Sequence, residues 1–237
     1  MAQIPFFRRL CMIYVTGDTH GDISRFKSMN LHKLKKGDSI IVCGDFGFIW
    51  DGSKDEMNNI KWLSKRKYKV LFVEGAHESF EMINKYPKVD FMGGRARQIS
   101  ENIYQLMRGE VYEIEGKKIF AFGGGDDEEL ELADIRECID FQRLPTEEEC
   151  AHARENLERA GNSVDYIITY DVGFKLRSML KMESNCFNNL HAYLNEVATN
   201  CKFKTWFFGC FHMDKRIPPI YHAVYRNIYE IESGKEL

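Results

Sequence analysis

Five short apolar runs, rich in β-branched and aromatic residues, constrain the fold of this chain more than any other feature. They begin at Met12, Ser39, Lys69, Asp165 and Lys204. Each run is continuous rather than alternating, which is typical of strands that are covered on both faces. Helical patterns separate several of them, so the sequence predicts an α/β fold.

Three segments carry the helical patterns. Residues 54–66 place apolar side chains at three-residue spacing. Residues 146–161 open with Thr146 and Glu149 at the spacing of a capping box and stop at a glycine. In residues 185–200 the apolar side chains form one stripe, which again predicts an amphipathic helix.

A second group of strands is predicted further along the chain. Residues 103–107, 111–116 and 117–124 have the pattern of a hairpin-rich meander, with a turn at Glu115-Gly116. Residues 220–232 predict two more strands. The order of these elements favours two packed sheets with helices outside them.

The domain organisation is expected to be simple. No repeat, low-complexity tract or linker interrupts the chain, so we expect a single domain over residues 12–237. Residues 1–11 precede the first strand pattern and are interpreted as an N-terminal extension.

Charge and hydropathy exclude some classes of partner. The net charge is −3, so no nucleic-acid partner is indicated, and no apolar run is long enough for a membrane span. The basic runs 33–36 and 65–69 are interpreted as solvated surface. Residues 125–140 hold eight carboxylates and one arginine and are expected to form a solvated helix or loop. If that segment overhung the functional site, it would repel a polyanionic substrate.

Cysteine usage points to a reducing compartment. The chain has seven cysteines, an odd number, and no C-x-x-C pair. Several lie within apolar runs, where a reduced thiol packs as a small hydrophobic group. The sequence therefore predicts a cytoplasmic protein without a disulfide framework.

Polar residues follow four of the five apolar runs at the point where each run ends. These residues are Asp18, His20, Asp45, His77 and His212. Ligands bind at the carboxyl ends of the strands in open α/β sheets, so we expect these side chains to converge although they are far apart in sequence. Carboxylate oxygen and neutral imidazole suit Mn²⁺, Fe or Zn²⁺, which predicts a divalent metal site.

The motifs "GDTHGD", "GDFGFIWDG", "EGAHE", "IITYD" and "FGCFH" together resemble those of the calcineurin-like metallophosphoesterases over nearly the whole chain. The resemblance implies a four-layer α/β sandwich, in which two mixed β-sheets are flanked by helices. It also implies hydrolysis of a phosphomonoester or phosphodiester with two metal ions.

The resemblance assigns the site residues unevenly. The four ligands that the family uses for its first metal correspond to Asp18, His20, Asp45 and His212, and all are present. The three ligands private to the second metal are replaced, by Ala76, Tyr170 and Cys210. His77 corresponds to the family histidine that stabilises the transition state or protonates the leaving oxygen.

Selective replacement suggests that second-metal binding was lost as a unit, because random decay would have affected both sites. Ala76 offers no ligand atom. Tyr170 as a phenolate could bind trivalent iron and Cys210 as a thiolate could bind zinc, while simple packing is an equal alternative for both. The expected cofactor is therefore one divalent ion, with a second ion in doubt.

Two hypotheses of function follow. In the first, the protein is a phosphoesterase for a small substrate with an impaired or mononuclear centre, where Asp45 and the ion activate water and His77 assists the leaving group. In the second, it is a catalytically inactive relative that binds a phosphate-containing ligand or a protein partner. We favour the first, because nothing structural requires a histidine at the position of His77.

The protein phosphatase branch of the family fits less well. Its second motif continues with an arginine that binds phosphate, and no arginine follows Gly44-Asp45 in this chain. Phe46, Phe48 and Trp50 are interpreted as an apolar lip instead, with core packing as the alternative for any one of them.

Overall fold

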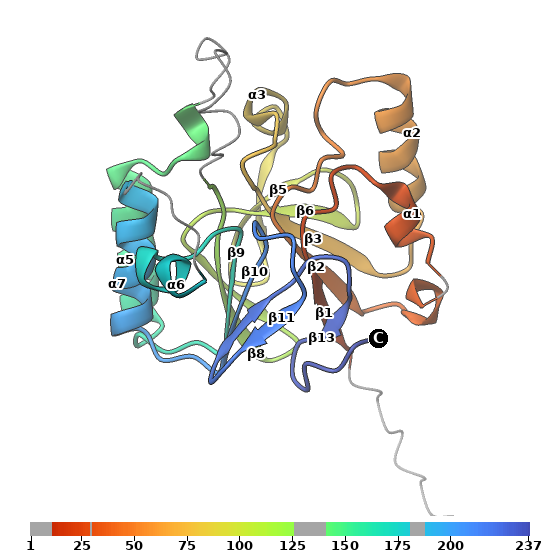
Figure 1. Ribbon diagram of the computed structural model, residues 1–237. Helices are drawn as coiled ribbons and strands as arrows, with labels where there is room; N and C mark the ends of the chain where they lie inside the picture. The colour runs from red at the N-terminus through yellow and green to blue at the C-terminus, as the bar shows by residue number, and fades with distance from the viewer. Residues whose placement is uncertain (1–10, 29, 126–140, 181–187) are drawn as a thin grey trace, which may run out of the picture.

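The computed structural model describes residues 11–28, 30–125, 141–180 and 188–237. Two mixed β-sheets lie face to face between two groups of helices, as the sequence predicted (Figure 1). The seven-stranded sheet has the order β13 (Tyr229–Glu230), β1 (Ile13–Thr16), β2 (Ser39–Cys43), β3 (Lys69–Val73), β6 (Ile103–Leu106), β5 (Gly94–Gln98) and β4 (Lys88–Phe91).

The six-stranded sheet is built from the later part of the chain. Its order is β11 (Lys215–Ile217), β12 (Tyr221–Ala223), β10 (Thr205–Phe208), β9 (Tyr166–Thr169), β8 (Lys117–Phe122) and β7 (Glu110–Ile114). Strands β8, β9, β10 and β12 are parallel, and the two edge strands are antiparallel. The predicted meander exists, although β6 belongs to the first sheet and β7 and β8 to the second.

The main core lies between the two sheets. Ile41 and Leu71 from the first sheet and Ile168 and Phe207 from the second belong to one buried cluster. Strands β1, β2, β3 and β6 pair in parallel, so their carboxyl ends meet at one edge. This edge faces the carboxyl ends of β9 and β10, which allows one site to draw on both sheets.

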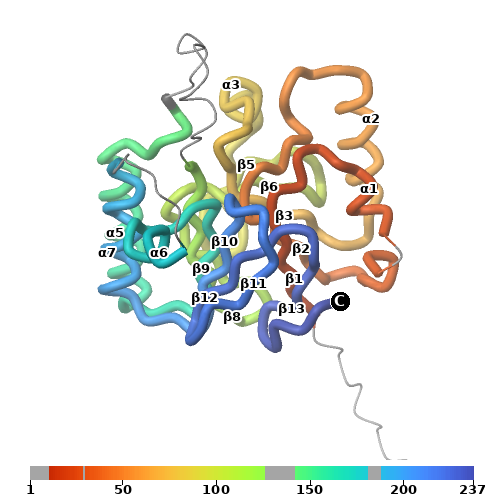
Figure 2. Tube along the Cα trace, in the orientation of Figure 1, coloured from red at the N-terminus to blue at the C-terminus, as the bar shows by residue number. Residues whose placement is uncertain are grey.

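Helices cover the outer face of each sheet (Figures 1 and 2). The first sheet carries α1 (Ile23–Phe26), η1 (Leu31–Lys33) and α2 (Lys54–Leu63), and α3 (Phe80–Ile83) follows β3. The second carries η3 (Phe141–Arg143), α5 (Glu147–Arg159), α6 (Phe174–Met179) and α7 (Asn189–Asn200). Both bonds of the predicted capping box at Thr146 and Glu149 are present.

Three strands were missed by sequence patterns. These strands are β4, β5, which contains Arg95 and Arg97, and β11. Strands β4 and β11 are short edge strands, while β5 lies between β6 and β4. All three are rich in polar residues and give little apolar periodic signal, which explains the omission. The predicted acidic segment over residues 126–140 lies outside the described residues, as do residues 1–10 of the predicted extension.

Candidate metal centre

Three loops at the carboxyl ends of strands carry the four residues that the sequence predicted as metal ligands. Asp18 and His20 follow β1, Asp45 follows β2 and His212 follows β10. All four have positive φ angles, of 29°, 46°, 43° and 46° respectively. Residues other than glycine rarely adopt this left-handed backbone conformation, and backbone strain of this kind concentrates at functional sites. Among the described residues, Met92, Glu115, Asn162 and Cys210 also have positive φ angles, so the angle fits a functional site at these loops but does not identify the ligands.

Asp45 lies at the centre of the cluster. Its Oδ2 accepts a hydrogen bond from the Tyr170 hydroxyl at 3.0 Å and lies 3.1 Å from His77 Nδ1. His20 Nε2 is 3.9 Å from the same oxygen. Burial raises the pKa of Asp45, but hydrogen bonds from the His77 side chain and backbone outweigh it, so the pKa is lowered overall. Asp45 is therefore an ionised, buried carboxylate in contact with several donors.

His20 and His212 face each other across the site. Their Nε2 atoms lie 3.2 Å apart, and His212 Nε2 is 4.0 Å from Asp18 Oδ2. Burial lowers the pKa of His20, which favours the neutral imidazole that binds metals. Two imidazole nitrogens this close fit a shared proton or a shared cation.

Asp18 provides the test of whether a cation fits. Its side chain is buried, and Oδ1 accepts a hydrogen bond from the backbone N–H of Cys210 at 3.2 Å. Oδ2 has no hydrogen-bond partner among the described residues. Burial, and then the charge of Asp45, raise the pKa of Asp18. A cation beside Oδ2 would satisfy this oxygen and offset the repulsion between the two carboxylates.

The donor atoms of His20, Asp45 and His77 form a compact set, all within 4.8 Å of one another. From the sequence, His77 was expected to stabilise the transition state or to protonate the leaving oxygen. Its backbone N–H also donates to Asp45 Oδ1 at 2.8 Å, so two contacts fix the residue. The structure therefore adds His77 to the residues that could contribute to holding a cation.

Tyr170 lies beside Asp45 at one of the three substituted positions. Its buried ring packs between Gly44 and Gly125, and an added Cβ on Gly44 would lie 2.0 Å from the ring. Burial, and then the neighbouring Cys210 and Asp45, raise the pKa of Tyr170. In this arrangement the phenol is a hydrogen-bond donor to Asp45 Oδ2.

The other two substituted positions also lie close to Asp45. Burial, and then the charges of Asp171 and Asp18, raise the pKa of Cys210, which keeps its thiol neutral. Ala76 is buried. The chain before it passes close to Asp45, because a Cβ added to Gly75 would lie 2.0 Å from Asp45 Oδ1. Of the three residues, Ala76 has no donor atom, while Tyr170 and Cys210 carry an oxygen and a sulfur near Asp45.

Two residues that support the site were missed by sequence analysis. Arg25 on α1 donates to the carbonyl oxygens of Gly17 and Asp18 at 2.8 and 2.9 Å. Glu78 is buried and accepts the backbone N–H of Phe46 at 2.6 Å, which fixes the turn after Asp45. Sequence offers no signal for contacts to backbone groups, although Glu78 lies within a motif already singled out.

A buried polar cluster fixes the backbone next to Tyr170. The carboxylate of Asp171 contacts Arg177 on α6, with both oxygens within 2.7 Å, and His191 on α7 at 2.9 Å. All three side chains are buried. Burial raises the pKa of Asp171, but these partners outweigh it and lower the pKa overall. The cluster therefore joins two helices to the end of β9.

A pocket of about 420 Å³ adjoins the candidate centre. His20 and His77 line it together with Trp50, which is 53% exposed. The predicted apolar lip is wrong in part, because Phe46 and Phe48 are fully buried. Phe46 stacks on Phe72 at 4.3 Å, so the core binds both phenylalanines and leaves only the tryptophan at the surface.

Comparisons with known proteins complete the description. A family model described as calcineurin-like phosphoesterase matches residues 12–209. A solved structure, described as a candidate 5′-nucleotidase from Staphylococcus aureus in complex with alpha-ketoglutarate, is similar with a TM-score of 0.45 and 12% sequence identity. The alignment covers 93% of this chain and 50% of that chain. The search of curated proteins found no match.

Proposed function

Since the chain belongs to the calcineurin-like phosphoesterase family, we propose that it hydrolyses a small phosphate ester at the site around Asp45. The observation that carries the proposal is the buried Asp18 Oδ2, which has no partner among the described residues and faces His212 Nε2. Asp18, His20, Asp45 and His212 would hold one divalent ion, with Mn²⁺, Fe and Zn²⁺ matching their chemistry.

When bound, such an ion would polarise a phosphoryl oxygen and make hydroxide accessible near neutral pH. The residues of the chain orient the reactants and move the protons. Asp45 is ionised and accepts from its neighbours, so it can also orient an attacking water. The water oxygen forms a bond to phosphorus while the bond to the leaving oxygen breaks.

For His77 we propose a role at the leaving oxygen. It lines the pocket, and its contacts with Asp45 fix the orientation of its ring. A protonated His77 would give its proton to the leaving oxygen as the bond to phosphorus breaks.

We propose further that the centre works with one principal ion. Support comes from the three positions where relatives of this family carry second-metal ligands. Tyr170 donates to Asp45 there, Cys210 is a neutral thiol and Ala76 has no donor atom. Loss of a second ion removes several kcal/mol of transition-state stabilisation, so we expect slow turnover, lower by about a thousandfold or more.

The pocket supports a small substrate rather than a long polyanion. Asp51, Asp55 and Glu56 line it, and their charges oppose a chain of phosphates. The exposed face of Trp50 offers a surface for a flat group on the substrate. For the location we propose a reducing cytoplasm, supported by the thiol state of the five described cysteines.

Metal content and turnover test the proposal together. Protein loaded with Mn²⁺ and desalted is expected to hold about one ion per chain and to hydrolyse p-nitrophenyl phosphate or bis(p-nitrophenyl) phosphate. His20→Ala should lose both properties, while His32→Ala, at an exposed histidine on η1, should keep them.

Other outcomes distinguish the alternatives. One bound ion with no turnover of either ester would favour the inactive relative that binds a phosphate-containing ligand or a partner. Two tightly bound ions would contradict the single-ion centre but would not contradict the proposed phosphoesterase activity. Absence of both metal and turnover in the wild-type protein would contradict the whole proposal.

A further inference from the structure

The largest pocket lies at the opposite end of the central strands from the metal centre. Lys35 and Lys36 line it and precede β2, while Arg66 and Lys67 line it and precede β3. The candidate metal ligands follow the carboxyl ends of strands, including that of β2. A five-residue strand spans roughly 16 Å, so a ligand in this pocket would be well separated from the metal centre.

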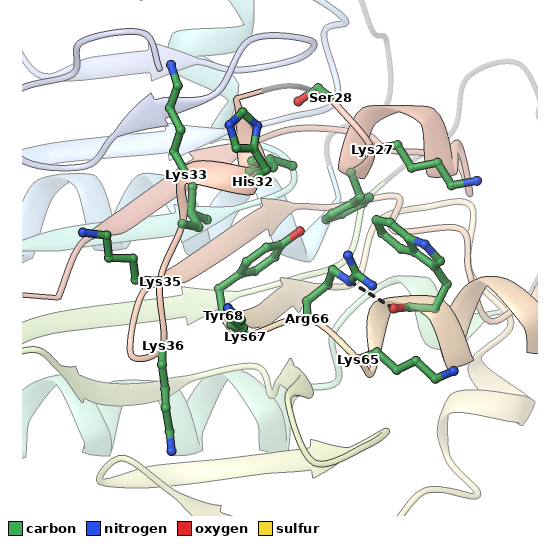
Figure 3. A pocket seen from close by; sticks show the side chains of 14 residues that line it. Lys27, Ser28, His32, Lys33, Lys35, Lys36, Lys65, Arg66, Lys67 and Tyr68 are labelled. Atoms are coloured by element: carbon green, nitrogen blue, oxygen red, sulfur yellow. Dashed lines mark hydrogen bonds between the residues drawn. The ribbon is translucent and has the colours of Figure 1, made fainter.

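The pocket gathers positive charge from two runs that are about thirty residues apart in sequence. The lining includes the side chains of six lysines, Lys27, Lys33, Lys35, Lys36, Lys65 and Lys67. Arg66 and His32 add to them, and none of the described lining residues is acidic. Figure 3 shows the lysine side chains pointing in different directions around the pocket rather than toward one point. This spread fits an extended polyanion better than a single phosphate.

An aromatic platform lies within the basic pocket. The guanidinium of Arg66 stacks on Trp62 with its Cζ 3.9 Å from the ring centroid, and its Nε donates to the Trp62 carbonyl oxygen. Lys27 Nζ lies 5.6 Å from the same ring. Unstacked bases bind to aromatic rings and to guanidinium planes, so the outer face of this stack suits a base.

Tyr68 adds a polar group with no visible use inside the fold. Its side chain is buried and lines the pocket, and its hydroxyl has no hydrogen-bond partner among the described residues. In the view of Figure 3 its ring lies among the basic side chains, between Lys35 and Arg66. Burial raises the pKa of Tyr68 to about 12, so the hydroxyl remains a neutral donor for an oxygen or nitrogen acceptor.

We propose that this basic pocket binds a short single-stranded nucleic acid, with phosphates on the lysines and a base on the Trp62–Arg66 stack. The volume of about 1020 Å³ accommodates more than one nucleotide. Net charge alone gave no indication of such a partner, because the positive charge becomes a feature only when folding brings the two runs together. The proposal does not depend on phosphoesterase activity.

The concave shape argues against an anionic membrane as the ligand. A membrane-binding surface exposes apolar side chains that enter the lipid interface. The apolar lining residues Phe26, Leu31 and Leu34 are all buried. Duplex nucleic acid would reach the lysines but would leave the stacking platform without an exposed base.

Fluorescence anisotropy with labelled twelve-nucleotide oligo(U) and oligo(dT) tests the proposal, in EDTA so that no metal-dependent reaction intervenes. The variant Lys33→Gln/Lys36→Gln/Lys65→Gln removes three charges from the pocket. The matched control Lys88→Gln/Lys175→Gln/Lys202→Gln removes three charges from exposed lysines outside it. We expect the pocket variant to bind at least about tenfold more weakly and the control variant to bind as the wild type does.

Two further measurements separate the modes of binding. The slope of log affinity against log salt should fall by about two in the pocket variant, because each single-strand phosphate contact contributes about 0.7. Trp62→Leu should weaken binding of the oligonucleotides more than binding of heparin, which has charge but no bases.

Several results would overturn the proposal. These are failure of the wild type to bind either oligonucleotide, equal losses in the two triple variants, and tighter binding of a duplex of the same length. Binding to vesicles with 30% phosphatidylserine in preference to the oligonucleotides would assign the pocket to a membrane surface instead.

Discussion

Tyr170 donates its hydroxyl hydrogen to Asp45 Oδ2 over 3.0 Å, and this bond joins the end of β9 in one sheet to the end of β2 in the other. Both side chains are buried, so the bond is protected from competing water. It also occupies a lone pair of the Asp45 carboxylate. The contact therefore connects the two sheets at the candidate metal centre.

Tyr170→Phe should lower the free energy of unfolding of the metal-free protein by about 2 kcal/mol. The variant keeps the ring between Gly44 and Gly125 but removes a hydrogen bond to a charged group. Urea denaturation of both proteins in EDTA measures the difference. Tyr86→Phe, at a half-buried tyrosine, is the control and should change stability by less than about 0.5 kcal/mol. Equal losses of unfolding free energy in the two variants would show that the hydrogen bond from Tyr170 to Asp45 does not stabilise the protein.

Restoring donors at the three substituted positions should restore the second ion. In Ala76→Asn/Tyr170→His/Cys210→His, an amide oxygen and two imidazoles return beside Asp45. We expect the metal content to rise from about one to about two ions per chain, and turnover to rise at least about tenfold. Mass spectrometry and the aryl phosphate assay measure both. A stable variant that still binds one ion would show that these positions do not define a second site.

Asp18→Asn should separate metal binding from stability. The substitution replaces a buried carboxyl group that lies near Asp45, so the metal-free protein should gain unfolding free energy. The same change removes an anionic ligand, so Mn²⁺ affinity should fall at least about tenfold. Denaturation in EDTA and competition with a chelator measure the two effects. A loss of stability in EDTA would show that Asp18 is a structural residue.

His222 should make the protein sensitive to mild acid. The side chain is buried against Phe207 and Tyr229, and burial, and then Arg216, lower its pKa to about 4. Asp214 opposes this shift to a lesser extent. Since the folded pKa is below the unfolded value of 6.5, the stability is fully present above pH 6.5 and is lost as the pH falls toward 4.

At pH 5 this loss amounts to about 2 kcal/mol. His222→Phe keeps an aromatic ring beside Phe207 and Tyr229. Between pH 7.5 and pH 5 this variant should lose about 2 kcal/mol less unfolding free energy than the wild type. Urea midpoints at both pH values give the comparison. Parallel losses in the two proteins would assign the acid sensitivity to other groups.

The sequence predicted the site better than its surroundings. Parallel strands place their carboxyl ends at one edge, so Asp18, Asp45 and His212 could be brought together from strand patterns alone. The Thr146 capping box was equally readable, because it depends on neighbours three residues apart. Local rules therefore positioned the strand exits and the helix start.

Contacts that depend on packing could not be predicted. Phe46, Phe48 and Trp50 look alike in sequence, and only the fold decides that two enter the core and one remains exposed. The bond from Tyr170 to Asp45 joins residues 125 positions apart, and no pattern announces it. The basic runs also looked like ordinary solvated surface until η1 and the segment before β3 were seen to share one pocket.

The placement of the basic pocket and the metal centre at opposite ends of β2 makes the molecule electrically asymmetric along its central strands. On a negatively charged support the protein should adsorb by its lysine-rich end and leave the histidine-rich end open to solution. Immobilisation on cation-exchange beads should therefore orient the molecules uniformly, with the aspartate–histidine cluster accessible to small solutes.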